Sequence, residues 1–345
     1  MTIIIILCGI AILLEVGVRF VVFPLFIGES YRKNLLKSGY WPRRYMVKVD
    51  DEVRFILRKN YSCKDFRINS HGFRGGELKK SIKKDKNFIK IALIGDSIPF
   101  GSGMANNKNI YSDLTESYLS VELQRPVKFI NGAVPSYTIR QSYRRLVRDI
   151  SPWNPGIIVA QGFLNEVSLA RYLGDRYSPG MTWTDYRFDL TGKFHLAASE
   201  FSAFYNLFFT RSKNQGKEEW HHNLTEKVWE EITLYLHKIK DFLQERGISL
   251  VILDNPVCYS NFADNPGIAE DIRKYRYIIK QFCGENNAQN TGNPAGVHFL
   301  DLEAFDDDRT LFLDFTHFSA KGHRALAAML SQKIIRLFKG SVIKQ

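Results

Sequence analysis

The 345-residue sequence contains only four cysteines, and none of them belongs to a Cys-x-x-Cys pair. Closely spaced cysteines are the usual sign of a structural zinc site, and several in a short chain are the usual sign of a disulfide framework. The sequence therefore predicts neither a metal site nor such a framework. Cys258 and Cys283 could form one disulfide across the face of the core or stay as two separate thiols.

Motifs for nucleic-acid recognition are also missing, because the sequence has neither zinc-finger spacing nor an RNP-like motif. The formal net charge is nevertheless +12, with local basic clusters at residues 79–86 and 140–148. A charge of this size suits nucleic acid, anionic lipid or a polyanionic glycan and does not choose among them. Without a recognition motif, we expect no nucleic-acid partner. The sequence points to no particular protein partner.

One long apolar segment covers residues 3–27. At about 1.5 Å per residue, a helix of this length can cross a hydrocarbon core of roughly 30 Å. Glu15 and Arg19 interrupt the segment, but residues four apart share a helical face and can pair. No basic region precedes the segment and no small-residue cleavage site follows it, which disfavours a signal peptide. We interpret residues 1–28 as a transmembrane anchor, with a buried core helix as the alternative.

Residues 29–88 are rich in aromatic and basic residues and predict a membrane-proximal segment of short extended pieces and loops. A turn is expected around Gly72 within this segment, because glycines and polar residues cluster there. His71 and Arg74 could line a pocket, or the turn could lie at the surface and pack Phe73 on the core.

From residue 89 onward, short apolar β-branched runs alternate with amphipathic stretches. The expected strands are 89–96, 127–133, 156–162, 248–254 and 297–302, and the expected helices are 109–124, 138–150, 222–246, 266–284 and 319–338. Strands that alternate with helices indicate right-handed βαβ units and one parallel sheet. We therefore expect an α/β domain at residues 89–340, interrupted by an insertion at about 164–220 that is too long for an ordinary connection.

Polar residues follow several of the expected strands directly. Ser97 follows the first strand, Gly132 lies at the end of the second, Asn165 comes shortly after the third, and Asp314 and His317 precede the last helix. The carboxyl ends of parallel strands form the edge at which α/β sheets bind ligands. These residues are therefore expected to meet at one site, although Ser97 or its neighbour could instead simply cap a helix.

The residue types fit acyl transfer, which needs a nucleophile, a base, a group that orients the base and donors for the oxyanion. Ser97 is the candidate nucleophile, His317 the base and Asp314 the orienting carboxylate. The backbone N–H groups of Ser97 and Gly132 and the side-chain amide of Asn165 are the candidate oxyanion donors.

These segments resemble the sequence blocks of the SGNH hydrolases, also called GDSL esterases and lipases. The matching residues are Gly95-Asp96-Ser97-Ile98, Asn131-Gly132, Asn165 and Asp314-Phe315-Thr316-His317, in the order of the family. The resemblance covers residues 89–338. It implies a flavodoxin-like three-layer α/β/α fold and serine ester hydrolysis without a metal or cofactor. One departure is that Phe163 stands where the family commonly has the glycine of Gly-x-Asn-Asp.

The turn at residues 69–75 also resembles that of membrane-anchored bacterial members, which usually present the domain outside the cytoplasmic membrane. The positive-inside rule favours the opposite side, because five basic residues follow the apolar segment: Arg32, Lys33, Lys37, Arg43 and Arg44. We expect a membrane-anchored, extracytoplasmic serine esterase that removes an acyl group, such as acetyl, from a glycan or lipid. The alternatives are an acyltransferase to a sugar hydroxyl with the same triad, and a catalytically inactive subunit of a membrane complex.

Overall fold

The structure is a computed structural model that describes residues 2–17, 47–63, 65–104, 107–174, 177–182, 224, 226–262, 266–288 and 295–342. The chain divides into two compact units. One unit comprises Met1–Tyr45 and Trp183–Trp220, and the other comprises Met46–Thr182 and His221–Gln345. All of the predicted site residues belong to the second unit.

In the first unit the structure describes one helix, α1 (Thr2–Gly17). Its apolar side chains are exposed by between 45% and 73% at Ile10, Ile12, Leu13, Leu14 and Val16. Within the described ranges, no helix combines the length and the hydropathy that a membrane crossing requires. The predicted anchor extends to residue 27, and its part beyond Gly17 lies outside the described residues.

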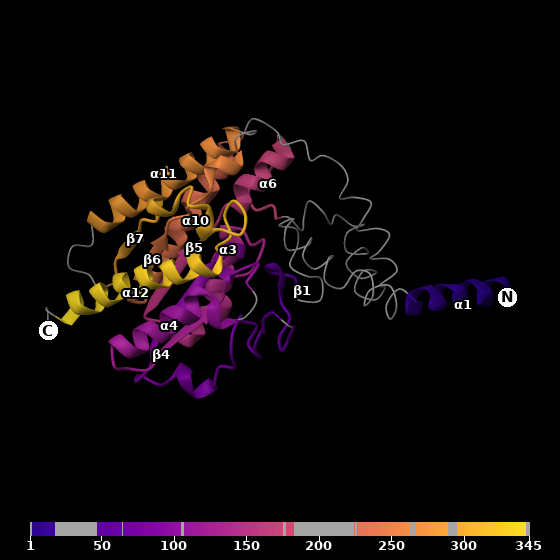
Figure 1. Cartoon of the computed structure of the whole chain (residues 1–345), viewed down its shortest axis with the longest axis horizontal. Helices are drawn as coiled ribbons and strands as arrows, with labels where there is room; N and C mark the ends of the chain where they lie inside the picture. The colour runs from indigo at the N-terminus through magenta and orange to yellow at the C-terminus, as the bar shows by residue number, and fades with distance from the viewer. Residues whose placement is uncertain are drawn as a thin grey trace. The chain divides into compact units, whose positions relative to one another are not determined.

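The second unit is built on a five-stranded parallel sheet with the order β4-β3-β5-β6-β7 (Figure 1). The strands are β3 (Ile89–Gly95), β4 (Val127–Asn131), β5 (Ile157–Gln161), β6 (Ser249–Leu253) and β7 (Val297–Leu300). Each strand lies within two residues of its predicted bounds. From β3 the chain moves first to β4 and then back to β5 on the other side. This reversal creates a switch point, where the carboxyl ends of strands leave room for a ligand.

Helices cover both faces of the sheet and complete a three-layer α/β/α fold. The longer helices are α4 (Tyr111–Glu122), α5 (Ile139–Arg145), α6 (Asn165–Leu173), α10 (Lys227–Gln244), α11 (Pro266–Ala288) and α12 (Ala320–Val342). Helix α12 packs beside α4, while α10 packs against α5, α6 and α11. Helix α6 lies at the start of the predicted insertion, which therefore begins as regular structure; residues 183–220 lie outside the described residues.

Short helical turns connect these elements. They are α3 (Ser97–Phe100), η2 (Lys80–Lys83), η3 (Asn107–Asn109), the π-helical η4 (Leu146–Ile150), η5 (Ser151–Trp153), η8 (Tyr259–Phe262), η9 (Glu303–Phe305) and η10 (Arg309–Leu311). Turn α3 is the most important for function, because it joins the end of β3 and begins with Ser97.

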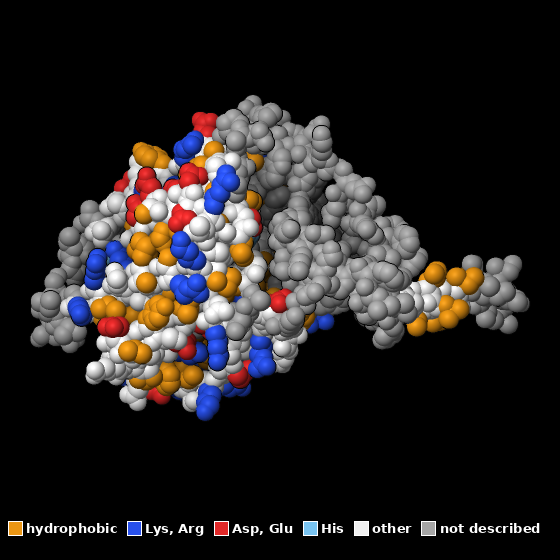
Figure 2. Space-filling model, in the orientation of Figure 1, with side chains coloured by type: hydrophobic (Ala, Val, Ile, Leu, Met, Phe, Trp, Pro, Cys, Tyr) orange, Lys and Arg blue, Asp and Glu red, His pale blue; other side chains and the backbone are white. Residues whose placement is uncertain are grey.

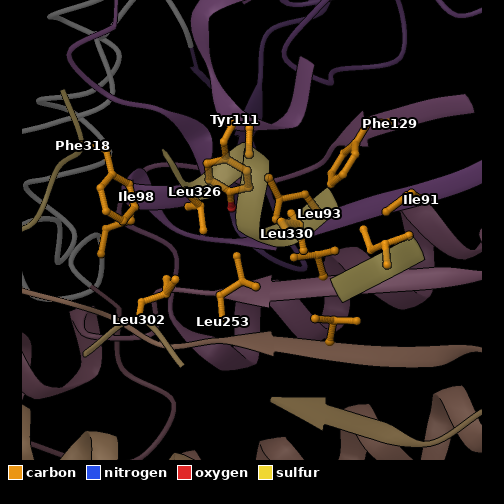
Figure 3. Close-up of a cluster of buried hydrophobic side chains, with 14 of the residues drawn as sticks. Ile91, Leu93, Ile98, Tyr111, Phe129, Leu253, Leu302, Phe318, Leu326 and Leu330 are labelled. Atoms are coloured by element: carbon orange, nitrogen blue, oxygen red, sulfur yellow. The ribbon is translucent and has the colours of Figure 1, made fainter. Parts of the chain in front are cut away.

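The largest group of buried apolar side chains lies between the sheet and helices α4 and α12. Figure 3 shows Tyr111 of α4 and Leu326 and Leu330 of α12 gathered against Leu93 of the sheet. All four are fully buried. Burial of an aliphatic side chain of this size stabilises the fold by roughly 1.5–3 kcal/mol. The packing of these side chains holds β3 in place, and Ser97 follows directly after the end of this strand.

The part of the predicted membrane-proximal segment that the structure describes, from Val47 onward, folds with the sheet in the second unit. It contains an antiparallel hairpin, β1 (Val47–Asp50) and β2 (Arg54–Leu57). Phe55 of the hairpin packs edge to face on Tyr137, which lies in the loop after β4, with 5.1 Å between the ring centres. The Gln141 side-chain amide donates to the Val53 carbonyl at 2.7 Å. The segment therefore supports a loop at the carboxyl edge of the sheet.

The structure of this unit decides between the two states expected for Cys258 and Cys283. Cys258 and Cys283 are both buried and both are free thiols, so they form no disulfide with each other. Lysine and arginine side chains are spread among acidic and apolar ones over the described part of the face in Figure 2, rather than gathered in one patch.

Candidate active site

Strand β3 ends in a turn that only glycine can make. Gly95 has a φ of 140°, and a Cβ there would lie 1.8 Å from the carbonyl oxygen of Gln161 in β5. Asp96 then caps α3, because its side chain accepts a hydrogen bond from the Ile98 N–H at 2.9 Å. Asp96 is thus the capping residue, and the Ser97 hydroxyl is left for another partner.

That partner is His317, more than 200 residues away in the chain. The Ser97 Oγ lies 2.9 Å from His317 Nε2, and His317 Nδ1 lies 2.7 Å from Asp314 Oδ2. The other oxygen, Asp314 Oδ1, accepts the backbone N–H groups of Thr316 (2.9 Å) and His317 (2.8 Å). When the Nδ1 proton faces Asp314, the Nε2 lone pair faces the serine hydroxyl. The predicted nucleophile, base and carboxylate therefore form one hydrogen-bonded chain.

The electrostatics of the pair suit a base that works near neutral pH. Burial disfavours the charged ring, but the hydrogen bond and negative charge of Asp314, with a smaller contribution from Asp96, raise the pKa of His317 above 6.5. Burial likewise opposes the charge of Asp314, yet its bonds to the His317 ring and to two backbone N–H groups lower its pKa below 3.8. Asp314 is therefore ionised wherever His317 titrates.

Asp96 connects the nucleophile turn to the third block. Besides the Ile98 N–H, it accepts the backbone N–H groups of Phe163 and Leu164 and, at 3.2 Å, the Asn165 side-chain nitrogen. Its side chain is almost fully buried, and burial raises its pKa to about 6. Asp96 thus joins the turn at Ser97 to the loop after β5, in addition to the helix capping that the sequence suggested.

The strand order and the positions of the blocks now decide the fold family. Ser97 follows β3 at the switch point, Asn165 begins the helix after β5, and the turn with Asp314 and His317 precedes the last helix. This is the flavodoxin-like strand order, which the resemblance to the SGNH hydrolases implies.

No protein-family model matches the chain, and no curated protein matches it. Solved structures do match, among them a lipase/acylhydrolase from Enterococcus faecalis at 18% identity, covering 71% of this chain and 94% of that one, with a TM-score of 0.44. An acetyl xylan esterase named AlAXEase matches at 15% identity, with coverages of 71% and 100% and a TM-score of 0.45. An acetylxylan esterase from Geobacillus stearothermophilus matches at 16% identity, with coverages of 71% and 93% and a TM-score of 0.44. Similarity at this level assigns no activity to the chain, whose chemistry must follow from its own residues.

Asn165 lies beside the turn that contains Ser97. Its side-chain amide already donates two hydrogen bonds within the protein. Asn165 Nδ2 donates to Asp96 Oδ2 at 3.2 Å and to the Tyr137 carbonyl at 3.0 Å. Phe163 stands where the family commonly has glycine and adopts a φ of 69° while fully buried. A left-handed conformation costs a residue with a side chain roughly 1–2 kcal/mol, so the packing of this phenylalanine must offset that cost.

The prediction that the Gly132 N–H faces the oxyanion is wrong. That N–H donates to the Leu93 carbonyl at 2.9 Å, as an extension of the β3–β4 pairing. A Cβ at Gly132 would lie 2.4 Å from Ile150 Cδ1. Glycine is needed at this position for the close approach of Ile150 and Leu93, and its N–H is not available to a substrate.

The same loop contains a backbone donor that is not used within the described chain, which the sequence did not reveal. Ser136 is partly exposed and has a φ of 67°, and in the described part of the chain no residue accepts a hydrogen bond from its N–H. Hydrogen bonds hold the loop on both sides of Ser136. The Val134 N–H donates to the Gly95 carbonyl at 3.0 Å, and the Tyr137 carbonyl accepts a hydrogen bond from Asn165 Nδ2. A glycine would have signalled this left-handed position, whereas serine does not.

Substitution of Ser136 by glycine tests whether its backbone rather than its side chain matters. We expect Ser136→Gly to keep kcat for ester hydrolysis within about three-fold of wild type, because glycine adopts positive φ freely and keeps the N–H. Ser136→Val should lower kcat by at least about ten-fold, because a β-branched residue strains this conformation. Steady-state kinetics of both variants check the expectation. A large loss in Ser136→Gly would assign the role to the hydroxyl instead.

A buried ion-pair network holds the turn of the catalytic base. Arg276 of α11 pairs with Asp254 and with Asp306, the latter at 2.5 Å. Asp306 also accepts the Val257 N–H at 2.9 Å. Carboxylates from two loops therefore share one guanidinium, which joins the loop after β6 to the loop that leads to His317.

His323, six residues after His317 in the sequence, is a packing residue. His323 is fully buried, its ring stacks on Tyr111, and its Nδ1 accepts the Tyr111 N–H at 3.2 Å. Burial and the nearby positive charges of Arg74 and His317 lower its pKa to about 3. His323 therefore stays neutral and takes no part in proton transfer at physiological pH.

Proposed function

We propose that this chain is a membrane-anchored serine esterase that hydrolyses an acyl ester on a glycan or lipid. The observation that carries the proposal is the hydrogen-bonded chain from Ser97 through His317 to Asp314, with distances of 2.9 and 2.7 Å. It lies at the carboxyl edge of the sheet, where ligands of this fold class bind.

In the proposed reaction, Ser97 Oγ attacks the ester carbonyl while its proton passes to His317 Nε2. Asp314 stabilises the resulting imidazolium through Nδ1 and keeps the ring in the required tautomer. The tetrahedral intermediate collapses when His317 returns the proton to the leaving alcohol, which leaves an acyl group on Ser97. Water then attacks the acyl carbon with His317 as the base, and the acid is released.

Two backbone N–H groups are proposed to stabilise the oxyanion, those of Ser97 and Ser136. The Ser97 N–H lies at the start of α3, where the first N–H groups of a helix have no partner within it. Asn165 can supply a third donor if the oxyanion replaces Asp96 as the acceptor for its Nδ2, since that bond is the longer of its two. Donors fixed in this way act where charge develops in the transition state.

Truncation of Asn165 tests its place in this set. Asn165→Ala is expected to lower kcat by about 10²–10³-fold with a smaller effect on KM, because an oxyanion donor acts mainly in the transition state. The exposed Asn87→Ala serves as the matched control and should leave both constants unchanged. Steady-state kinetics with a p-nitrophenyl ester provide the measurement. An unchanged kcat in Asn165→Ala would remove Asn165 from the oxyanion site.

The acyl group and the acceptor are tested together with purified full-length chain in detergent. A series of p-nitrophenyl esters from acetate to long-chain esters gives the acyl preference, and an added glycan acceptor separates hydrolysis from transfer. Turnover that disappears in Ser97→Ala supports the esterase. A folded wild-type chain that turns over none of these esters would contradict the proposal and favour an inactive subunit of a membrane complex.

The anchor is proposed to be residues 3–27, with the catalytic domain outside the cytoplasm. Support comes from the apolar sequence of this segment and from the exposed apolar side chains of α1. Recovery of the chain in the membrane fraction, with protease access from outside intact cells, is the expected result. Protection of the domain in intact cells would place it in the cytoplasm, as the basic residues after the segment favour.

A further inference from the structure

The turn at residues 69–75 places a buried arginine behind the nucleophile. Arg74 is 3% exposed, and its backbone N–H donates to the Asn131 carbonyl at the end of β4 at 3.1 Å. Its neighbour Phe73 is also buried. The turn is therefore neither an open pocket nor a purely surface feature, and its arginine points into the second unit.

The guanidinium group of Arg74 donates hydrogen bonds to the chain at the end of α3 and just after it. Nη1 donates to the carbonyl oxygens of Phe100 (2.9 Å) and Gly101 (2.7 Å), and Nη2 donates to that of Met104 (3.0 Å). Nε donates to the Asn107 side-chain oxygen at 3.1 Å. The Arg74 side chain thus binds the segment that follows Ser97 at the end of α3, at Met104 and at Asn107.

Two aromatic rings fix the plane of this guanidinium. Arg74 Cζ lies 5.1 Å from the centre of the Phe66 ring and 4.8 Å from that of Phe100. A guanidinium offers several N–H donors in a rigid plane and stacks on aromatic faces, whereas an ammonium is a compact point charge on a flexible stem. Lysine at this position could keep the charge but could not bind the same carbonyls together.

We propose that Arg74 is a positioning residue that holds the Ser97 hydroxyl in line with His317. Helix α3 is only four residues long, so its far end, Phe100, is one turn from Ser97. The carbonyls at the end of a helix have no partner within it, and Arg74 supplies one. Without Arg74, a single side-chain hydrogen bond, from Asn131 Nδ2 to the Pro99 carbonyl at 3.1 Å, would hold the far half of the turn. The inference rests on the proposed esterase function.

The position of Ser97 matters because proton transfer needs the 2.9 Å contact with His317 Nε2. A misplacement of about 1 Å at a reacting group can cost roughly 10²-fold in rate. Substrate binding does not depend on this contact to the same degree. Loss of Arg74 is therefore expected to affect kcat far more than KM.

The test compares Arg74→Lys with Arg171→Lys in the full-length chain. Arg171 is also 3% exposed and binds Asp271 and the Gly267 carbonyl, so its substitution is a matched loss of a buried arginine elsewhere in the unit. Competent sites are counted by titration with a fluorophosphonate, and kcat is expressed per competent site. We expect about a 10–100-fold lower kcat and a KM within about three-fold for Arg74→Lys, and an unchanged kcat per site for Arg171→Lys.

A milder variant covers the case in which Arg74→Lys does not fold. Asn107→Ala removes only the acceptor of Nε and should lower kcat per competent site by about three-fold without changing KM. Wild-type kcat per site in a folded Arg74→Lys, or in Asn107→Ala if the lysine variant does not fold, would overturn the positioning role. Absence of turnover and labelling in the wild type would instead overturn the proposed esterase itself.

Discussion

Replacement of Ser97 by alanine is expected to lower kcat for ester hydrolysis by about 10⁵–10⁶-fold, because loss of the nucleophile removes most of the catalysis of a serine hydrolase. The residual rate would come from the oxyanion donors and from substrate binding. The fold should persist, since the hydroxyl is partly exposed and its hydrogen bond is to His317. Hydrolysis of p-nitrophenyl acetate by the purified full-length variant gives the rate.

Ser102→Ala is the matched control for this change. Ser102 lies five residues further along and is also partly exposed, and its backbone N–H rather than its hydroxyl bonds to the Ser97 carbonyl, at 3.0 Å. Its loss should leave kcat within about two-fold of wild type, as a surface substitution usually does. A Ser97→Ala variant with more than a tenth of the wild-type kcat would show that another group performs the chemistry.

Replacement of Asp314 by asparagine is expected to reduce kcat/KM by about 10³–10⁴-fold, because an amide no longer holds His317 in the tautomer that accepts the serine proton. The pH profile should change as well. In the wild type, kcat/KM should fall as pH drops through the raised pKa of His317, above 6.5, since the protonated ring cannot act as a base. Without the charge and hydrogen bond of Asp314, only the smaller contribution of Asp96 opposes the effect of burial on the ring, and the acid side of the pH profile should move to lower pH.

Asp308→Asn provides the control for the Asp314 variant. Asp308 lies on the same loop, faces solvent and caps the Thr310 N–H, a role that asparagine also performs. It should change neither kcat/KM nor the pH profile. If kcat/KM of Asp314→Asn falls at the same acidic pH as in the wild type, Asp314 does not set the pKa of His317.

The sheet was predictable because each strand is a short apolar run with turn-forming residues at its ends. Ile89–Gly95, for example, ends at a glycine whose Cβ would collide with β5. The meeting of Ser97, His317 and Asp314 was predictable because the residue types are chemically distinctive and topology brings strand ends together. The hairpin of β1 and β2 was harder to predict, because its packing on Tyr137 depends on contacts between residues that are distant in sequence.

The donors and supports of the site were less predictable, for physical reasons that differ by residue. Gly132 was misassigned because a glycine can serve close packing as well as ligand approach, and sequence alone does not distinguish the two. Ser136 was missed because its left-handed backbone carries no sequence signal. The contacts of Arg74 and Asp96 join segments that only the folded chain brings together.

Covalent labelling of the full-length chain with a fluorophosphonate, followed by peptide mapping, tests the central claim most directly. The Ser97 oxygen would form a bond to phosphorus as fluoride leaves, and His317 would take the serine proton. We expect one label per chain, on the peptide that contains Ser97, with a labelling rate that falls as pH drops below the pKa of His317. A folded wild-type chain that takes up no label, or takes it up at a different serine, would contradict the account.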